Sequence, residues 1–386
     1  MTPYKLYGMP ASLYTAKARS YLRKRQVPFI EYGANHPDFA TRIAPAVGRW
    51  IVPVLEAPDG TIIQDGSAII DYLETNTEGQ FSAYPSSALA RTVSLLFEMF
   101  GGEGLLRPAM HYRWNFDAQN MTFIRDEFIS SLAPIGASEA EGNAFFDNAS
   151  GRMRGATASF GVAESTKALI EASYVAFLTL FSAHLKHFPY LLGGRPTIGD
   201  FGLVSALYAH LDRDPAATTL MRQQAPAVSR WVERMNAPGD IWVEHAEDPR
   251  LMDAENVPTS LKKLMIYVAE EYLPEITAHV AFANEWLAAR PTLVAGTNGL
   301  DDPANRYIGS AEFTWRGTTM KSAVLPYRFY LLQRIQDCFE RALASEQLAI
   351  RALFDETGLA PLLALKTVRR VARVNHFEVW GELRDS

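Results

Sequence analysis

The chain has 386 residues, of which 48% are hydrophobic and 21% are charged, and its formal net charge is −6. The composition is typical of an ordinary globular protein without a low-complexity tract, and the length suits two or three domains. The acidic balance disfavours nucleic acids and anionic membranes as partners, because both carry negative charge.

Three further observations concern the cellular compartment. The N-terminus, MTPYKLYGMPASLYTAKARSYL, lacks the basic-then-apolar pattern of a secretion signal, and no stretch is expected to be long and apolar enough to span a bilayer. The single cysteine, Cys338, excludes an internal disulfide framework and a cysteine-based zinc site. Its amphipathic helical surroundings favour a role as core filler over one as a nucleophile. We therefore expect a cytoplasmic protein.

Strands and helices alternate in the first part of the chain. Strands are predicted at YKLYG and VPFIEYG, on either side of a basic amphipathic helix, SLYTAKARSYLRKRQ. Two further strands, IVPVLEA and TIIQ, are separated by the turn PDG, and the helix GSAIIDYLETN follows. This order predicts a compact α/β unit of two layers.

After about residue 80 the spacing of apolar residues becomes helical. EGQFSAYPSS is expected to be a linker, and the segment NAPGDIWVEHAEDPRLMDAENVPTS marks a second break. A short hairpin is expected within GTNGLDDPANRYIGSAEFTWRGTTM, in an otherwise helical final part. We expect domains at 1–78, 86–238 and 256–386. Near the C-terminus a basic run at helical spacing predicts one solvated helix face, formed by Lys366, Arg369, Arg370 and Arg373.

A proline interrupts the apolar strand IVPVL. Proline removes a donor from a sheet and is therefore expected at an edge or at a position of special geometry. A cis Val52–Pro53 bond would leave the N–H and C=O of Val52 free to pair with an extended ligand, as in strand addition. A trans proline on an edge strand is equally compatible with the sequence.

The stretch QDGSA precedes an apolar helical run. Asp65 or Ser67 is expected to cap this helix, whose first free N–H groups and dipole form an anion site. Capping without any ligand is the alternative. Because a hairpin separates QDGSA from IVPVL, the proline edge and the helix start are expected to hold the backbone and the carboxylate of one ligand.

The order of these motifs resembles the glutathione S-transferase superfamily. IVPVL precedes QDGSAIIDYLE, and the helical part contains RPTIGDFGLVSALYAHL, so that the resemblance covers roughly residues 1–237. In its last motif Thr197 is expected to cap a helix while Asp200 reaches back to it. The resemblance implies an α/β thioredoxin-like N-terminal domain that binds glutathione, an all-α domain that forms an acceptor pocket, and a homodimer. A mostly α C-terminal extension follows.

The resemblance also implies that a hydroxyl or thiol just after the first strand activates the glutathione thiol. A free thiol has a pKa of about 8.5, and lowering it by two units requires about 2.7 kcal/mol of selective thiolate stabilisation. A hydroxyl that donates a hydrogen bond at a helix N-terminus supplies energy of that order. Ser12 matches the position of the serine-type and cysteine-type members. Tyr7, near the tyrosine-type position, is the second choice and Tyr14 the third, with a plain helix cap as the alternative role for Ser12.

For glutathione itself, the residues implied are Arg49, Val52, Pro53, Asp65, Gly66 and Ser67. The chain departs from the family at one of these positions. The family usually has Glu-Ser where this chain has Asp65-Gly66, so a side-chain donor for the γ-glutamyl carboxylate would have to come from Ser67. Arg49 is expected near the glycyl carboxylate, and Arg19 falls where the family's helix carries a basic residue.

Aromatic residues and histidines raise two further questions. HYRWNF places Tyr112, Trp114 and Phe116 at the end of the first long helix of the helical part, which in the family faces the thiol. They would take an apolar electrophile there, although packing between helices explains them as well. His184 and His187 lie one helical turn apart, but no carboxylate has the matching offset, so no metal site is expected.

Two functions fit these observations. The first is a transferase that adds the glutathione thiolate to a small hydrophobic electrophile. The second is a non-catalytic glutathione- or ligand-binding scaffold protein of the same fold, with the region from about 240 to 386 as its interaction surface. Within that region Tyr327 and Arg328 follow Pro326 at a helix start, where a cap is an adequate explanation.

Overall fold

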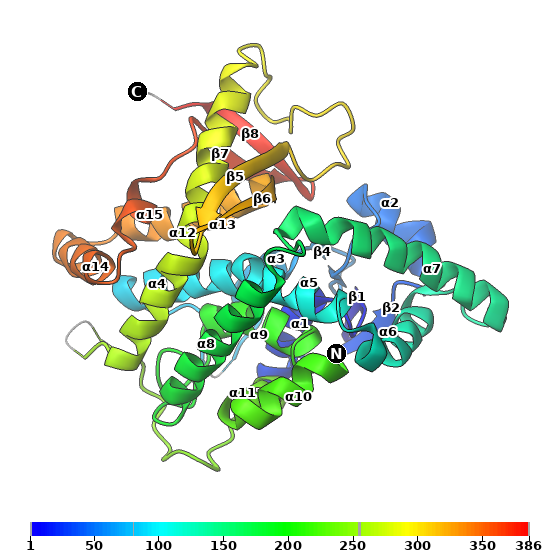
Figure 1. Ribbon diagram of the computed structural model, residues 1–386, viewed down its shortest axis with the longest axis horizontal. Coiled ribbons are helices and arrows are strands. Elements are labelled where there is room, and N and C mark those ends of the chain that lie inside the picture. Colours follow the sequence, from blue (N-terminus) through cyan, green and yellow to red (C-terminus); the bar gives the residue numbers. More distant parts are fainter. Residues whose placement is uncertain (1, 80, 254–255, 385–386) are drawn as a thin grey trace.

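The computed structural model describes residues 2–79, 81–253 and 256–384 (Figure 1). Position 80 of the predicted linker and positions 254–255 of the predicted second break lie outside the described residues. The chain forms a small mixed sheet with helices, then a helical region, then a mostly helical extension that contains two hairpins. This order confirms the predicted fold class, whereas the three predicted domain boundaries stay predictions.

The N-terminal unit is built on a four-stranded sheet with the order β2-β1-β3-β4. Its first strand runs parallel to β2 and antiparallel to β3, which pairs in turn with β4. The elements are β1 (Tyr4–Gly8), α1 (Leu13–Lys24), β2 (Phe29–Gly33), the π-helical turn η1 (Phe39–Ile43), α2 (Ala44–Val47), β3 (Val54–Glu56), β4 (Ile62–Gln64) and α3 (Gly66–Asn76). The strand predicted at IVPVLEA is shorter than expected, since it begins only after the proline.

The two faces of this sheet pack against different layers. Leu6 and Leu55 belong to the large core that the sheet shares with the helices, whereas Tyr7 and Val54 pack with Phe39 in a smaller core. The sequence predicts a basic amphipathic helix at α1, but that helix is buried along nearly its whole length. The reason is that α9 and α11 of the helical region cover the side that a solitary domain would expose to water.

The helical region packs onto α1. It consists of α4 (Ala88–Met99), the π-helical turn η2 (Phe100–Gly104), α5 (Leu106–Trp114), α6 (Asp117–Leu132), α7 (Glu139–Gly155), the 3₁₀ turn η3 (Ala156–Phe160), α8 (Lys167–Leu185), α9 (Ile198–Ala209), α10 (Pro215–Gln224) and α11 (Pro226–Asn236). At the start of α9, Asp200 accepts hydrogen bonds from the N–H and the hydroxyl of Thr197, at 2.9 and 3.0 Å. The predicted capping box is therefore confirmed.

One helix corrects the expectation about membrane spans. By length and composition alone, α8 is long and apolar enough to cross a bilayer. In the structure its residues Phe177, Leu178 and Phe181 are buried, and the helix packs against α5, α11 and α12. Its apolar composition is accounted for by this position between helices.

The extension begins with a long helix and ends with a hairpin. It consists of α12 (Thr259–Ala288), β5 (Gly309–Trp315), β6 (Thr318–Val324), α13 (Pro326–Glu340), α14 (Ala344–Glu356), α15 (Ala360–Ala364), β7 (Arg369–Val374) and β8 (Phe377–Leu383). The hairpin predicted after residue 296 is confirmed as β5–β6. The solvated helix face predicted for the basic run is wrong, because Arg369, Arg370 and Arg373 lie in β7 and Lys366 precedes this strand. Buried and exposed side chains alternate there, and Arg369 and Val371 face inward.

Buried ion pairs attach the extension to the helical region. Arg328, near the start of α13, pairs with Glu103 of η2 at 3.0 Å and with Glu275 of α12 at 2.7 Å. Glu275 also pairs with Arg107 of α5 at 2.6 Å. Removing one member of such a network leaves an uncompensated buried charge, so the contact fixes α13 in place. The first turn of α13 is thereby held against η2 and α12.

Candidate ligand-binding site

The backbone at Val52 is free to pair with a ligand. The Val52–Pro53 peptide bond is cis, one of the two forms left open by the sequence. Among the described residues, neither the N–H nor the C=O of Val52 has a hydrogen-bond partner. The next residues are paired, since Pro53 accepts from the Asp65 N–H at 3.3 Å and Val54 lies in β3. A short unpaired edge therefore precedes β3.

The N-terminus of α1 presents a hydroxyl. Ser12 is the N-cap, and its Oγ accepts a hydrogen bond from the Thr15 N–H at 3.2 Å. Ser12 is half-buried, and no described group accepts its hydroxyl proton. The residue is thus a helix cap, as its alternative role predicts, and it keeps a donor for a negatively charged atom.

The structure does not bring the two tyrosines to this site as free hydroxyls. Tyr7 is fully buried, and its hydroxyl donates to Glu56 at 3.3 Å. Tyr14 donates to Glu103 at 3.2 Å. Burial and the neighbouring carboxylates raise the pKa of both phenols above the ordinary value. Of the three hydroxyls considered, only that of Ser12 has an uncommitted proton.

The N-terminus of α3 is closed by Asp65. This residue has a φ of 93°, and its carboxylate accepts from the N–H groups of Ser67 and Ala68 at 2.9 and 3.1 Å. The Gly66 N–H has no partner among the described residues. A Cβ at Gly66 would lie 3.1 Å from the Lys17 side chain and 3.2 Å from the Tyr14 carbonyl oxygen. A serine at this position would therefore require these neighbours to shift by a few tenths of an ångström.

Ser67 is not available as the replacement donor. It is fully buried, accepts from Lys17 Nζ at 2.7 Å and donates to Glu98 at 2.8 Å. The hydroxyl of Tyr327, in the first turn of α13, lies 3.2 Å from its Oγ. The hydroxyl of Ser67 is thus used inside the protein, and the backbone N–H of Gly66 is the donor left at this helix start.

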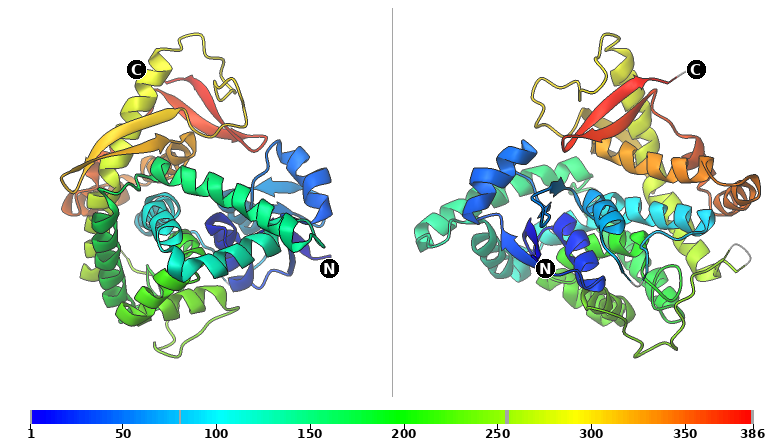
Figure 2. Two further views of the ribbon diagram at one scale, coloured as in Figure 1. Left: turned by 45° about the vertical axis from the view of Figure 1, so that its right-hand side comes forward. Right: turned by 180° about the vertical axis from the view of Figure 1, so that it is seen from behind.

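The hairpin β7–β8 contacts the same region. Arg373 pairs with Asp65 at 3.2 Å and with Glu378 at 3.3 Å, and it donates to the Gln64 carbonyl oxygen at 3.1 Å. Glu378 also pairs with the predicted site residue Arg49 at 3.3 Å. Figure 2 shows this hairpin, in red, extending toward the N-terminal unit in blue. We call the contacts of Tyr327, Arg373 and Glu378 with the N-terminal unit the junction.

Electrostatics favour the charged form of Asp65 in the junction. Burial alone would raise the pKa of Asp65, but Arg373, Lys17 and the Ala68 amide lower it below the ordinary value. Arg49 is held in addition by the ring of Phe377, 4.2 Å from its guanidinium. The extension therefore binds to the positions that the family resemblance assigns to glutathione.

Sequence reasoning missed all three junction residues. A helix cap is an adequate explanation of Tyr327 in the sequence, and Arg373 belongs to the run that predicts a helix face. One feature of the sequence could have indicated the hairpin: RVARV and FEVW alternate at period two around Asn375-His376. Both of these turn residues have positive φ, 48° and 71°, as the type I′ hairpin turn requires.

The three aromatic residues predicted for the acceptor lie in two different cores. They are in and after α5, which is separate from the longer α4, and not at the end of the first long helix. Tyr112 stacks on Phe116, with ring centroids 5.1 Å apart, in contact with the large core. Trp114 packs against Phe128 in a second core that also contains Phe313 and Trp315 of β5. The structure therefore does not bring Tyr112 and Trp114 together.

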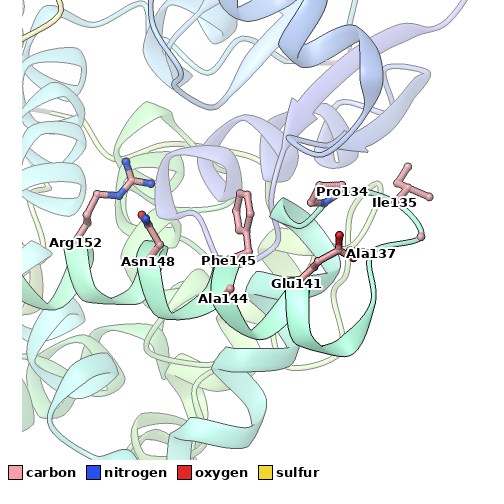
Figure 3. A pocket seen from close by; sticks show the side chains of 9 residues that line it. Pro134, Ile135, Ala137, Glu141, Ala144, Phe145, Asn148 and Arg152 are labelled. Carbon is pink, nitrogen blue, oxygen red and sulfur yellow. The ribbon is translucent and has the colours of Figure 1, made fainter.

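Two surface cavities lie away from these residues. A groove of about 680 Å³ follows α7 and the loop before it, and Figure 3 shows Phe145, Asn148 and Arg152 along it. A second cavity of about 380 Å³ is lined by Gly8, Pro10 and Arg19 among others. The residues predicted to bind glutathione line neither of the two.

His184 is a core histidine. Its ring nitrogens lie 2.9 Å from the Ser260 hydroxyl and 2.9 Å from the Leu191 carbonyl oxygen, and burial lowers its pKa to about 4. In the described part of the chain, no three His, Cys, Asp or Glu side chains are grouped as metal ligands. Cys338 is half-buried in α13, with its Sγ 3.4 Å from the Thr92 hydroxyl.

The chain resembles several solved structures at low identity. The β-etherase LigF from Sphingobium sp. strain SYK-6 is 16% identical, with 68% of this chain and 98% of that chain covered and a TM-score of 0.43. The glutathione transferase GSTFuA3 from Phanerochaete chrysosporium is 14% identical, with 61% and 96% covered and a TM-score of 0.44. A glutathione S-transferase of Ceriporiopsis subvermispora, in complex with glutathione, is 17% identical, with 61% and 96% covered and a TM-score of 0.40.

These structural likenesses are too weak to assign the chain to a family, but matches to family models do so for two of its regions. No curated protein matches the chain. The model of the glutathione S-transferase N-terminal domain matches residues 6–81, and that of the C-terminal domain matches residues 163–234. The first match contains the cis-proline edge and both helix N-termini, and the second contains the capping box of α9. The chain therefore carries an N-terminal and a C-terminal domain of the glutathione S-transferase superfamily.

Proposed function

We propose that this protein binds glutathione along the edge at Val52 and adds its thiolate to a hydrophobic electrophile. The observation that carries the proposal is the free backbone of Val52 beside two helix N-termini that each keep a donor. The N–H and C=O of Val52 would pair with the cysteinyl backbone of an extended tripeptide. The Gly66 N–H, at the positive end of α3, would bind the γ-glutamyl carboxylate.

Ser12 would activate the thiol. Its hydroxyl proton is uncommitted, and it lies at the N-terminus of α1, where the helix dipole favours a negative charge. A hydrogen bond donated to the thiolate, together with this dipole, stabilises the deprotonated form selectively. The thiolate then forms a C–S bond with the electrophilic carbon of the acceptor. The bond from that carbon to the leaving group breaks, and the leaving group departs as an anion with the bonding electron pair. Ser12 is the catalytic residue in this proposal.

A second function is favoured by the junction. Asp65, Ser67 and Arg49 are all held by residues of the extension, so the family's ligand positions are partly satisfied inside the chain. A binding or scaffold protein that keeps the fold without efficient thiol activation would tolerate such contacts. The free donor of Ser12 favours the enzyme, whereas the extension favours the scaffold protein.

One experiment separates the two functions. Glutathione is titrated by calorimetry into the native protein and Ser12→Ala, and turnover of 1-chloro-2,4-dinitrobenzene is measured for both. A transferase binds glutathione in both forms and loses most of its turnover in Ser12→Ala. Ser138→Ala, which removes the exposed cap of α7, is the matched control and retains native turnover. Binding without turnover in the native protein would establish the scaffold function. If the native protein shows neither binding nor turnover, glutathione is not its ligand.

A further inference from the structure

Arg306, in the loop of the extension that precedes β5, has no ion-pair partner within the described part of the chain. Two residues after Arg306, the Ile308 N–H donates to the Val324 carbonyl oxygen at 3.0 Å. This hydrogen bond places the loop that holds Arg306 near the start of α13. The side chain is half-buried and its Nε is enclosed without a hydrogen-bond partner. No carboxylate of the described residues is within ion-pair distance of its guanidinium.

The groups around Arg306 belong to the candidate site. Tyr14, Glu378, Glu103 and Asp65 act on it electrostatically, and Tyr14 is two residues from Ser12. Burial alone would lower the pKa of Arg306, but these groups raise it above the ordinary value. The guanidinium therefore stays charged within electrostatic range of Asp65, the cap of α3, and of Tyr14 in the first turn of α1.

Each nearby carboxylate is already paired with another cation. Glu103 accepts from Arg328 at 3.0 Å and from Tyr14 at 3.2 Å. Asp65 pairs with Arg373, and Glu378 is shared by Arg49 and Arg373. Arg306 is thus a surplus cation in a network where the other guanidinium groups have partners of their own. An enclosed guanidinium nitrogen without a hydrogen-bond partner is costly, and a guanidinium offers a planar set of donors that matches a carboxylate.

We propose that Arg306 binds a carboxylate of the ligand, so that the extension supplies part of the site as well as covering it. This inference rests on the proposed function. Glutathione carries two carboxylates, and the Gly66 N–H provides for only one of them. The carboxylate on Arg306 belongs either to glutathione or to an acidic acceptor, and both sources share the same chemistry.

The test compares three variants with the native full-length protein. Arg306→Met removes the charge, and Arg306→Lys keeps it without the planar fork. Arg341→Met is the matched control in the same extension, since its side chain is 82% exposed at the end of α13. Calorimetry measures the Kd of glutathione and of its glycyl ethyl ester. Steady-state kinetics measure the Michaelis constants for a pair of acceptors, the anionic 4-chloro-3-nitrobenzoate and the neutral 4-chloro-3-nitrobenzamide.

If Arg306 binds a carboxylate of glutathione, the Kd of glutathione should be about tenfold higher in Arg306→Met than in the native protein. The increase should be smaller in Arg306→Lys and absent in Arg341→Met. If this is the glycyl carboxylate, the ester binds the native protein as weakly as glutathione binds Arg306→Met. If it is the γ-glutamyl carboxylate, the variant weakens both ligands equally. If Arg306 binds an acidic acceptor instead, Arg306→Met should have an unchanged Kd for glutathione. Its Michaelis constant should be about tenfold higher for the benzoate and unchanged for the benzamide. Unchanged values for all four probes overturn the proposal.

Two readouts keep this test independent of the proposed function. If the native protein does not bind glutathione, the proposed function fails, and titration with glutarate then decides the role of Arg306. Glutarate bound by the native protein and not by Arg306→Met supports the proposal, and no binding overturns it. Without ligand, Arg306→Met is expected to melt at or above the native Tm. A fall as large as that of Arg328→Met would identify a structural ion pair and overturn the proposal.

Discussion

Two helix N-termini of the N-terminal unit, those of α1 and α3, differ in what they leave free. At α1 the cap is Ser12, whose hydroxyl proton has no described acceptor. At α3 the cap is Asp65, whose carboxylate is shared between two backbone amides and Arg373 of the extension. A ligand at α1 would meet an open donor, whereas a ligand at α3 would meet a site that the chain already occupies in part.

This difference teaches that a helix cap and a ligand site are distinguished by their remaining hydrogen-bonding capacity. Ser12 and Ser67 are both serines in a first helical turn or at its cap, and both would suit an anion. Yet Ser67 is fully buried and bonded to Lys17, Glu98 and Tyr327. Substitutions at α3 should therefore act mainly on stability, and those at α1 mainly on chemistry.

The largest effect is expected at Asp65. Asp65→Ala removes a helix cap, places alanine at a φ of 93° and deprives Arg373 of a partner. These losses together should lower the free energy of unfolding by about 4 kcal/mol. Asp65→Asn keeps the cap and tolerates positive φ, so its loss should be less than half as large. Urea denaturation of both variants measures this, and equal losses would show that the charge of Asp65 outweighs its conformation.

The next effect contrasts the two serines. Ser12→Ala should raise the pKa of the bound glutathione thiol by about two units, or about 2.7 kcal/mol, with about 1 kcal/mol lost in stability. Ser67→Ala should leave that pKa unchanged and cost about 1.5 kcal/mol of stability, because Tyr327 and Lys17 each lose a partner. The ultraviolet absorbance of the thiolate against pH gives the pKa, and denaturation gives the stability. The same thiol pKa shift in both variants would contradict the distinction between α1 and α3.

A third effect concerns the pH dependence of the junction. The pKa of Asp65 in the folded protein is below the ordinary value of an aspartate. The charged carboxylate therefore contributes its full stabilisation when the pH is above the ordinary pKa, and this stabilisation is lost as the pH falls through the folded-state pKa. Arg373→Met should cost about 2 kcal/mol at pH 7. The difference between native protein and variant should persist down to about pH 5 and shrink below about pH 4. Denaturation midpoints from pH 3 to 7 test this, and a difference that grows on acidification would refute it.

A feature could be predicted from the sequence when the residues that form it lie close together along the chain. The helix GSAIIDYLETN is found at residues 66–76 as predicted, because turn chemistry and apolar spacing are local. The same holds for Thr197 and Asp200, three positions apart. Tyr327, however, is separated from Ser67 by 260 positions, and no local pattern encodes that contact.

The basic run near the C-terminus shows a second limit. Its charges fit both a helix and a strand, since Arg369 and Arg373 recur at period four and therefore also at period two. The structure resolves this in favour of the strand because β8 supplies a partner. Likewise Lys17 and Arg19 are predicted on a basic helix face, but α9 covers that helix. Tertiary packing, not local preference, decided both positions.

The smallest effect tests whether α3 can be made to resemble the family. Gly66→Ser restores the side-chain donor of the usual Glu-Ser pair, next to the free backbone N–H. The new Cβ would lie 3.1 Å from Lys17 and 3.2 Å from the Tyr14 carbonyl oxygen, so these neighbours must shift by a few tenths of an ångström. We expect about 1 kcal/mol or less of lost stability, because serine is preferred to glycine in a helix and offsets part of the crowding.

In return, the glutathione Kd should fall about threefold in Gly66→Ser, since one extra hydrogen bond to a carboxylate is gained at the price of local strain. Gly66→Ala is the matched control: it introduces the same Cβ without the hydroxyl and should bind glutathione no better than the native protein. Calorimetry decides between them. If serine and alanine weaken binding alike, crowding by Lys17 and Tyr14 outweighs any donor at this position. The N-terminus of α3 would then serve its ligand through the backbone of Gly66 alone, which sharpens its contrast with the side-chain donor at α1.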